Sequence, residues 1–199
     1  MILFKNRSQS DNWIVYHEAL GNTNNMYLDA TNATHDRADT FSDASPTSSV
    51  FTLGDASGVN NNTDSIIAYC FAPKQGFSAM GSYIGNGADT QFIYTGFTPA
   101  FLLVKGSSNT SHWTLWDNKR LTYNATYGRD RILFANLSNA EQDNSSDGGV
   151  DFLSNGFCWR GTASMTGTTE VNEGSAGYIY MAFAEAPFVN SNGVPCNAR

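Results

Sequence analysis

The sequence predicts an all-β protein made of two tandem, related β-sandwich modules of a jelly-roll or lectin-like kind. Short strand-like runs rich in Val, Ile, Tyr, Phe and Trp alternate with clusters of Gly, Asn, Asp and Ser. No window shows a helical period. The same ordered series of strand-like runs also occurs twice within the 199 residues, which indicates an internal duplication.

The duplication rests on four ordered matches. In the first, Lys5 and Trp13 have the same spacing as Lys105 and Trp113. The further matches pair residues 26–30 with 132–136, 49–53 with 155–159, and 66–72 with 178–184. The offset between the copies grows from 100 (Trp13 to Trp113) to 106 (Phe51 to Phe157) and to 112 (Phe71 to Phe183). The second copy is therefore predicted to contain two insertions of six residues in polar loops, where extra length costs little.

The first module is expected over residues 1–78, and the second over residues 79–199 with a C-terminal tail. Residues 80–87 and 91–97 are typical of two strands joined by a turn, a hairpin that leads into the second module. The first module has no such hairpin before Ile2, which favours a chain that begins inside a longer polypeptide. The run 178–184 is apolar at every position and predicts a central strand covered on both faces.

Composition and charge restrict the partners. A net charge of -7 and a pI of about 4.7, with 11 scattered Lys and Arg residues, argue against nucleic acid, because binding a phosphate backbone needs clustered cations. No stretch approaches the roughly 18 apolar residues of a membrane span, and the N-terminus lacks the design of a signal peptide, so we expect no membrane insertion. The three cysteines, Cys70, Cys158 and Cys196, predict neither a disulfide framework nor a metal site.

Residues for catalysis form no recognisable pattern, and the sequence predicts a non-enzymatic protein without a cofactor. His17 and His112 adjoin Trp-containing strands and are expected to be half-buried, and His35 lies in a loop without a nucleophile motif. The segment 143–148 lacks the closing Glu of a calcium loop and favours an Asx-rich turn. A glycosidase would need two carboxylates, one of them with a raised pKa. The candidates for that chemistry are Asp117, Asp151 and Glu185.

Ligand binding is a stronger expectation than catalysis. An aromatic ring can stack on the apolar face of a pyranose while Asn bonds to its hydroxyl groups. The polar loop after Trp116 contains such residues, and one further aromatic residue ends a predicted strand. The predicted glycan-binding residues are therefore Tyr123, Asn124, Tyr127 and Trp159. The other tryptophans, Trp13, Trp113 and Trp116, are expected to pack in the core or between the modules.

Several segments have a distinctive composition, among them Lys-Asn-Arg-Ser at 5–8, Phe-Leu-Ser-Asn-Gly-Phe at 152–157 and Gly-Val-Pro-Cys-Asn-Ala-Arg at 193–199. Together with residues 94–101 and 178–185, they resemble a repeat domain of uncharacterised structural proteins of marine tailed phages. The resemblance implies a virion-surface protein from a fibre, a tail appendage or a capsid decoration. Its implied partners are copies of itself and other virion proteins, and it implies no catalytic residue.

Three functions stay open on this basis. The first is a fibre or appendage module that adheres to the host surface through many weak sites on a homo-oligomer. The second is a capsid decoration protein or a carbohydrate-binding module that recognises a host-surface glycan. The third is a polysaccharide-degrading enzyme, which would require that Asp117→Asn or Asp151→Asn abolish release of reducing ends.

Overall fold

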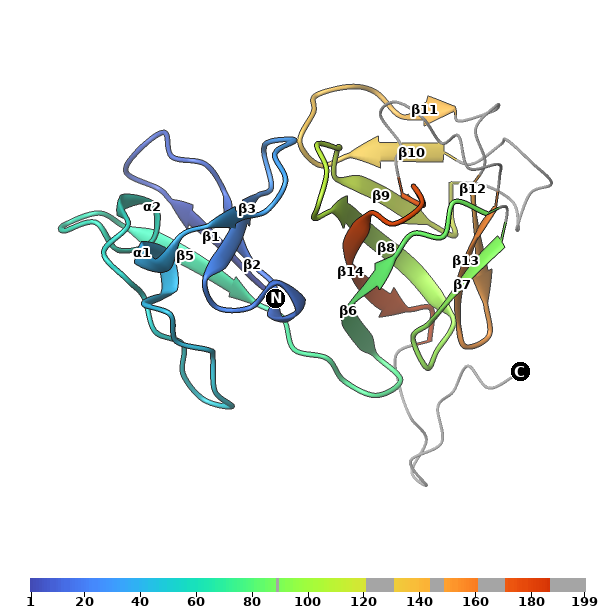
Figure 1. The fold of residues 1–199 in the computed structure, drawn as a ribbon, viewed down its shortest axis with the longest axis horizontal. Coiled ribbons are helices and arrows are strands. Elements are labelled where there is room, and N and C mark those ends of the chain that lie inside the picture. Colours follow the sequence, from blue (N-terminus) through green and yellow to red (C-terminus); the bar gives the residue numbers. More distant parts are fainter. Residues whose placement is uncertain (89, 121–130, 144–148, 161–170, 187–199) are drawn as a thin grey trace. The chain divides into compact units, whose positions relative to one another are not determined.

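The computed structural model describes residues 1–88, 90–120, 131–143, 149–160 and 171–186. They are nearly all β, with three antiparallel sheets, one turn of 3-10 helix and two short α-helices (Figure 1). The prediction of an all-β protein is confirmed. The chain divides into two compact units, Met1–Phe71 and Ala72–Arg199. The boundary precedes residue 78, because Lys74 bridges to Ser78, the first residue of a strand in the second unit.

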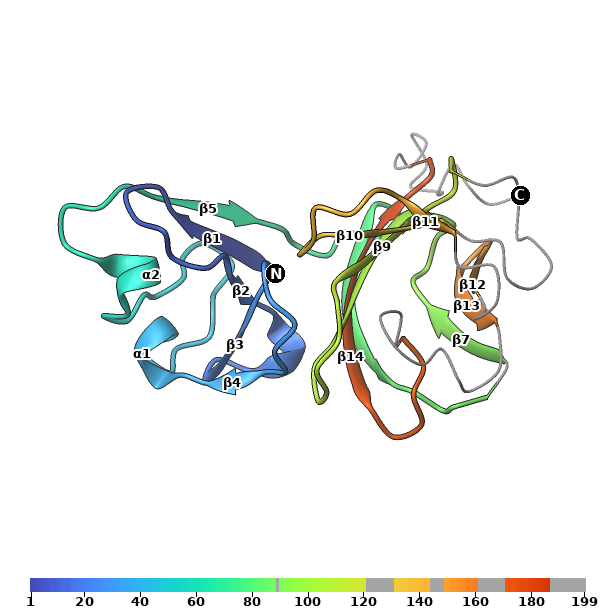
Figure 2. The same cartoon turned by 90° about the horizontal axis from the view of Figure 1, so that it is seen from above.

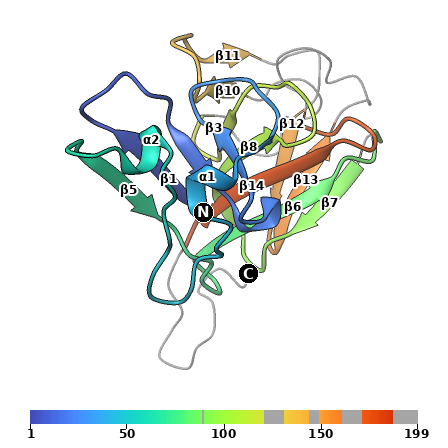
Figure 3. The ribbon, with the colours of Figure 1, turned by 60° about the vertical axis from the view of Figure 1, so that its left-hand side comes forward.

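The first unit contains a single five-stranded sheet in the order β4-β3-β2-β1-β5. In β1, Ile2, Phe4 and Asn6 are buried on one face while the alternate residues are half-buried, as the two-residue period of a strand requires. Both α-helices lie on that face (Figures 2 and 3). The elements are β1 (Ile2–Asn6), β2 (Ile14–Tyr16), the 3-10 helix (Glu18–Leu20), β3 (Asn24–Tyr27), β4 (His35–Asp36), α1 (Ala38–Phe41), α2 (Ser57–Asn60) and β5 (Ile66–Cys70).

The described residues of the second unit form two sheets, one of six strands in the order β11-β10-β9-β8-β14-β6 and one of three in the order β12-β13-β7. Figure 2 shows them as two layers, and a core rich in aromatic residues lies between them. The strands are β6 (Ser78–Ile84), β7 (Thr90–Tyr94), β8 (Pro99–Gly106), β9 (Thr114–Asp117), β10 (Arg131–Phe134), β11 (Gln142–Asp143), β12 (Gly149–Leu153), β13 (Gly156–Arg160) and β14 (Gly177–Ala184). As expected, β14 is an inner strand, between β8 and β6, and it is buried along most of its length.

The duplication is present in the strand pairing. The order β4-β3-β2-β1-β5 of the first unit is repeated by β11-β10-β9-β8-β14 in the second. The register agrees residue by residue: Leu3 pairs with Val15, and Leu103 pairs with Leu115. Likewise Leu3 pairs with Tyr69 in β5, and Leu103 pairs with Met181 in β14. The two units therefore share one five-stranded sheet design.

The sequence match of residues 26–30 with 132–136 was misaligned by one residue. Ile14 pairs with Tyr27, and its equivalent Thr114 pairs with Phe134, so Tyr27 corresponds to Phe134 at an offset of 107. The backbone N–H of Trp13 donates to the Asp29 carboxylate at 3.1 Å, and that of Trp113 donates to the Asn136 side chain, also at 3.1 Å. The insertions are consequently seven and five residues, since the offsets are 100, 107 and 112.

The first unit departs from the expected two-sheet sandwich. Residues 49–53 were expected to form the strand equivalent to β13, but they form no strand. A strand must place its peptide groups opposite a partner, and β13 lies between β12 and β7. The described residues 1–71 contain no equivalent of β7, so this segment has no partner strand. Instead, Phe51 packs its ring against Phe4, with ring centroids 5.5 Å apart.

Candidate functional site

The four predicted glycan-binding residues have different outcomes. Tyr123, Asn124 and Tyr127 lie in the segment 121–130, outside the described residues. Trp159 is fully buried in β13, the middle strand of its sheet. Its ring lies edge-on to Trp116, with centroids 5.6 Å apart, and its Nε1–H donates to the Tyr83 hydroxyl at 2.9 Å. The prediction that Trp159 stacks on a sugar is wrong, because stacking needs an exposed ring face.

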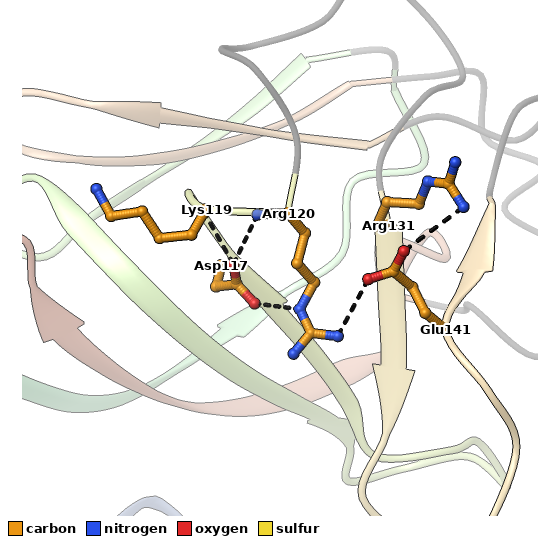
Figure 4. Close-up of polar contacts among 5 residues, drawn as sticks. All are labelled: Asp117, Lys119, Arg120, Arg131 and Glu141. Atoms are coloured by element: carbon orange, nitrogen blue, oxygen red, sulfur yellow. Dashed lines mark hydrogen bonds and ion pairs between the residues drawn. The ribbon is translucent and has the colours of Figure 1, made fainter.

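The two residues that border the segment 121–130 are joined through one carboxylate. The Arg120 guanidinium lies 3.4 Å from Glu141 Oε2, and the Arg131 guanidinium lies 3.5 Å from Glu141 Oε1 (Figure 4). Asp117, at the end of β9, also forms an ion pair with Arg120 and accepts the backbone N–H groups of Lys119 and Arg120 at 2.9 and 3.0 Å. Glu141 therefore connects both ends of the segment that contains the three tyrosine and asparagine candidates.

The electrostatics of Asp117 favour a structural role. Burial would raise its pKa, but hydrogen bonds from the Arg120 side chain and from the Lys119 and Arg120 backbone outweigh burial, and the pKa of Asp117 is lowered. A general acid in a glycosidase needs the opposite shift. The other two candidate carboxylates also have cationic partners, because Asp151 forms an ion pair with Arg160 and Glu185 lies 3.4 Å from Lys119.

Strand ends from both sheets gather around this network. Arg131 at the start of β10 pairs with Asp143 at the end of β11, and Gly149 at the start of β12 pairs with Arg160 at the end of β13. Residues 143 and 149 are only six positions apart, so these ends belong to one side of the second unit (Figure 1). We call it the loop-bearing end. Both insertions relative to the first unit fall between strands of the second unit, one between β9 and β10 and one between β11 and β14.

The remaining sequence candidates have structural roles where the structure describes them. His17 is buried, and its Nδ1 accepts the Ala19 N–H at 3.2 Å, which caps the 3-10 helix. His112 contacts Asn136, and the rings of His35 and Tyr27 lie 5.0 Å apart. Among the described residues, no group of three or more His, Cys, Asp or Glu side chains could hold a metal ion. Cys70 is exposed, whereas Cys158 is buried and its thiol donates to the Trp159 carbonyl oxygen at 3.6 Å.

The expected core packing is found for two of the other three tryptophans, Trp113 and Trp116. Trp113 and Trp116 are buried, and Trp13 is half-buried with its ring stacked on Tyr69 at 6.2 Å.

A family model described as a domain of unknown function, DUF7483, matches residues 1–187. The chain belongs to the DUF7483 family. Because one model spans both units, the duplication lies inside the DUF7483 domain and does not join two copies of it. No curated protein and no solved structure matches this DUF7483 chain significantly. None of the helices in the described ranges has the length and apolar character needed to cross a membrane.

Sequence reasoning missed Arg120, Arg131 and Glu141 as parts of this end of the DUF7483 domain. A signal was available, because an Arg adjoins each border of the segment 121–130, which contains the three binding candidates. The contribution of Glu141 could not be read from the sequence, since its contacts with both arginines depend on how β10 and β11 pair.

Proposed function

We propose that this DUF7483 chain is a structural module of a tailed-phage particle, displayed on the virion surface, which adheres to a host-surface glycan through its loop-bearing end. The observation that carries the proposal is the pair of ion pairs from Glu141 to Arg120 and Arg131. They fix both ends of the segment that contains Tyr123, Asn124 and Tyr127. The phage assignment rests on the resemblance described above, and the second unit is taken as a lectin-like sandwich.

The physical basis is preorganisation combined with avidity. Ordering a loop on binding costs conformational entropy, and fixing its ends beforehand reduces that cost. The ion pairs themselves are partly exposed, with side-chain exposures of 27% for Arg120 and 36% for Glu141, so each adds less than about 1 kcal/mol to stability. Their effect is therefore expected on binding more than on folding. Weak single sites become strong when many copies act together on one particle.

A glycan array tests the binding. The full chain, biotinylated and assembled on streptavidin, is expected to bind a restricted set of bacterial surface glycans. Tyr123→Ala and Tyr127→Ala should remove the signal, and Glu141→Gln should weaken it several-fold while the melting temperature stays nearly constant. Glu173→Gln is the matched control, because Glu173 contacts Asn109 instead and should leave binding unchanged. An array without signal, or a signal that none of the loop variants changes, would contradict the proposal.

The particle assignment needs a separate measurement. Immunogold labelling with antibodies against the chain should mark the surface of phage particles whose genome encodes it. Labelling that follows infected-cell debris and leaves purified particles unmarked would remove the virion assignment while leaving any glycan binding in place.

A further inference from the structure

We propose that the first unit contains a second ligand site, a polar pocket that takes a single neutral sugar residue or a comparable small polyol. The pocket measures about 120 Å³ and lies between the inner face of β2 and β3 and the helices α1 and α2. Its lining includes Asp11, Asn25, Tyr27, Arg37, Thr40 and Ser57. All of these residues belong to the first unit.

A buried amide in this pocket has an unmet hydrogen-bonding group. The Asn25 side chain is 1% exposed, and its Nδ2 donates to the Thr40 hydroxyl at 2.9 Å. Its Oδ1 has no partner in the described chain. Exchanging the amide O and N would leave Nδ2 without an acceptor instead. An unmet buried polar group costs about 1–3 kcal/mol, and a hydroxyl group, which both donates and accepts, would satisfy either orientation.

The internal duplication shows that the fold does not require this polarity. At the offset of 107, Asn25 corresponds to Ile132 and Tyr27 corresponds to Phe134. Ile132 and Phe134 are 0% and 5% exposed and belong to the apolar core between the two sheets of the second unit. The same sheet positions are thus filled by apolar packing in one unit and by a polar pocket in the other. Asn25 is a local feature of the first unit.

The charged and hydrogen-bonding side chains that line the pocket indicate which class of ligand it would bind. The rim has one anion, Asp11, and one cation, Arg37, and each already has a polar contact, with Asn6 and Asp39 respectively. A phosphate or a metal ion would call for an excess of one sign. Amide and hydroxyl groups beside the Tyr27 ring instead suit a neutral ring with several hydroxyl groups. Because one water needs only about 10–15 Å³, the pocket exceeds a single water site, yet it is smaller than the about 300 Å³ of ordinary ligand pockets.

This inference extends the proposed sugar binding to a second place in the chain, and the two sites can be tested separately. Amide chemical-shift changes of the isotope-labelled full chain would be followed during titration with the methyl glycosides of glucose, galactose, mannose and N-acetylglucosamine. We expect saturable shifts in residues lining the pocket for at least one glycoside. Asn25→Leu should weaken that binding at least tenfold, while Tyr127→Ala should leave it unchanged.

Asn32→Leu is the matched control, since Asn32 is exposed and lies outside the pocket. Thr40→Val provides a second variant if Asn25→Leu does not fold, because it removes only the hydroxyl that accepts from Asn25. The inference is overturned if no glycoside shifts pocket residues at 100-fold molar excess, which would leave water as the occupant. Equal binding by the wild type and Asn25→Leu, or by the wild type and Thr40→Val, would also overturn it. Shifts confined to the loop-bearing end would support the proposed function alone.

Discussion

Removing the Tyr83 hydroxyl is expected to lower the stability of the second unit, because this hydroxyl joins one of its sheets to the other. Tyr83 is in β6, and its hydroxyl donates to the Val171 carbonyl at 2.6 Å while it accepts the Trp159 Nε1–H at 2.9 Å. In Tyr83→Phe the ring can keep its stacking on Tyr178, with centroids 5.0 Å apart. Two buried partners would then lose their hydrogen bonds. At about 1–3 kcal/mol for each unmet group, we expect a loss of about 2–6 kcal/mol in the free energy of unfolding.

The pH dependence supplies a second measure of the same hydroxyl. Burial raises the pKa of Tyr83 well above 10, chiefly through desolvation. The stabilisation is therefore fully present below pH 10, where unfolded tyrosine is protonated, and is lost as the pH rises from there through the folded pKa. The slope is up to about 1.4 kcal/mol per pH unit. Tyr83→Phe should reduce this loss without removing it, because burial also raises the pKa of Tyr180.

Urea unfolding followed by tryptophan fluorescence measures both effects. A Trp13→Phe background restricts the signal to Trp113, Trp116 and Trp159, which all lie in the second unit. Tyr94→Phe is the control, because Tyr94 is 68% exposed and should change stability by less than about 0.5 kcal/mol. If Tyr83→Phe costs no more than Tyr94→Phe, the two hydrogen bonds of the Tyr83 hydroxyl do not stabilise the second unit as the structure indicates.

Five further substitutions test the packing, the strand register and the local backbone geometry. Trp159→Ala should lower the free energy of unfolding by about 3–5 kcal/mol in urea titrations, and a loss below about 1 kcal/mol would mean that the ring is not in the core. The backbone N–H of Ile67 faces β1, whereas that of Ala68 faces the open edge of β5. Ile67→Pro should therefore lower the free energy of unfolding by about 1–3 kcal/mol more than Ala68→Pro, as measured by thermal unfolding. Equal losses would refute the register between β1 and β5. A Cβ at Gly85 would lie 2.1 Å from a backbone carbonyl oxygen, whereas at Gly174 the nearest atom is 3.8 Å away. Gly85→Ala should therefore cost about 1–3 kcal/mol and Gly174→Ala almost nothing, and the reverse order would contradict the local geometry.

The sequence predicted the repeated sheet because apolar alternation and the Lys-to-Trp spacing survive in both copies. It misaligned the second match, residues 26–30 with 132–136, because sliding an apolar run by one residue still pairs apolar residues with apolar residues. The correct alignment is marked by two polar residues, Asp29 and Asn136. They occupy equivalent positions and accept the backbone N–H groups of the equivalent residues Trp13 and Trp113. Short Asx residues that follow a strand were therefore better alignment markers than the strand itself.

The failed predictions share one physical origin. Residues 49–53 have the composition of a strand, but composition does not supply the neighbouring strand that β13 has in β7. Trp159 was placed with Arg160 at the end of a strand, and β13 does end at Arg160, but the alternation of the strand turns the indole toward the core. In both cases the outcome depends on pairing between distant segments, which local patterns do not contain.

Comparison of the two units shows which features the five-stranded sheet itself requires and which features are specific to one unit. Both keep the same strand order and register, so these features satisfy the backbone hydrogen bonds of the fold itself. On the inner face, the second unit adds a three-stranded sheet with the Trp159 core, whereas the first unit adds two single helical turns and leaves a polar pocket at Asn25. A buried amide with an unmet acceptor lowers stability, and the Ile132 position shows that an apolar residue is compatible with the same sheet. Asn25→Leu should therefore raise the melting temperature of the first unit in the absence of ligand. A higher melting temperature together with lost sugar binding would show that the Asn25 amide serves binding and not the stability of the fold.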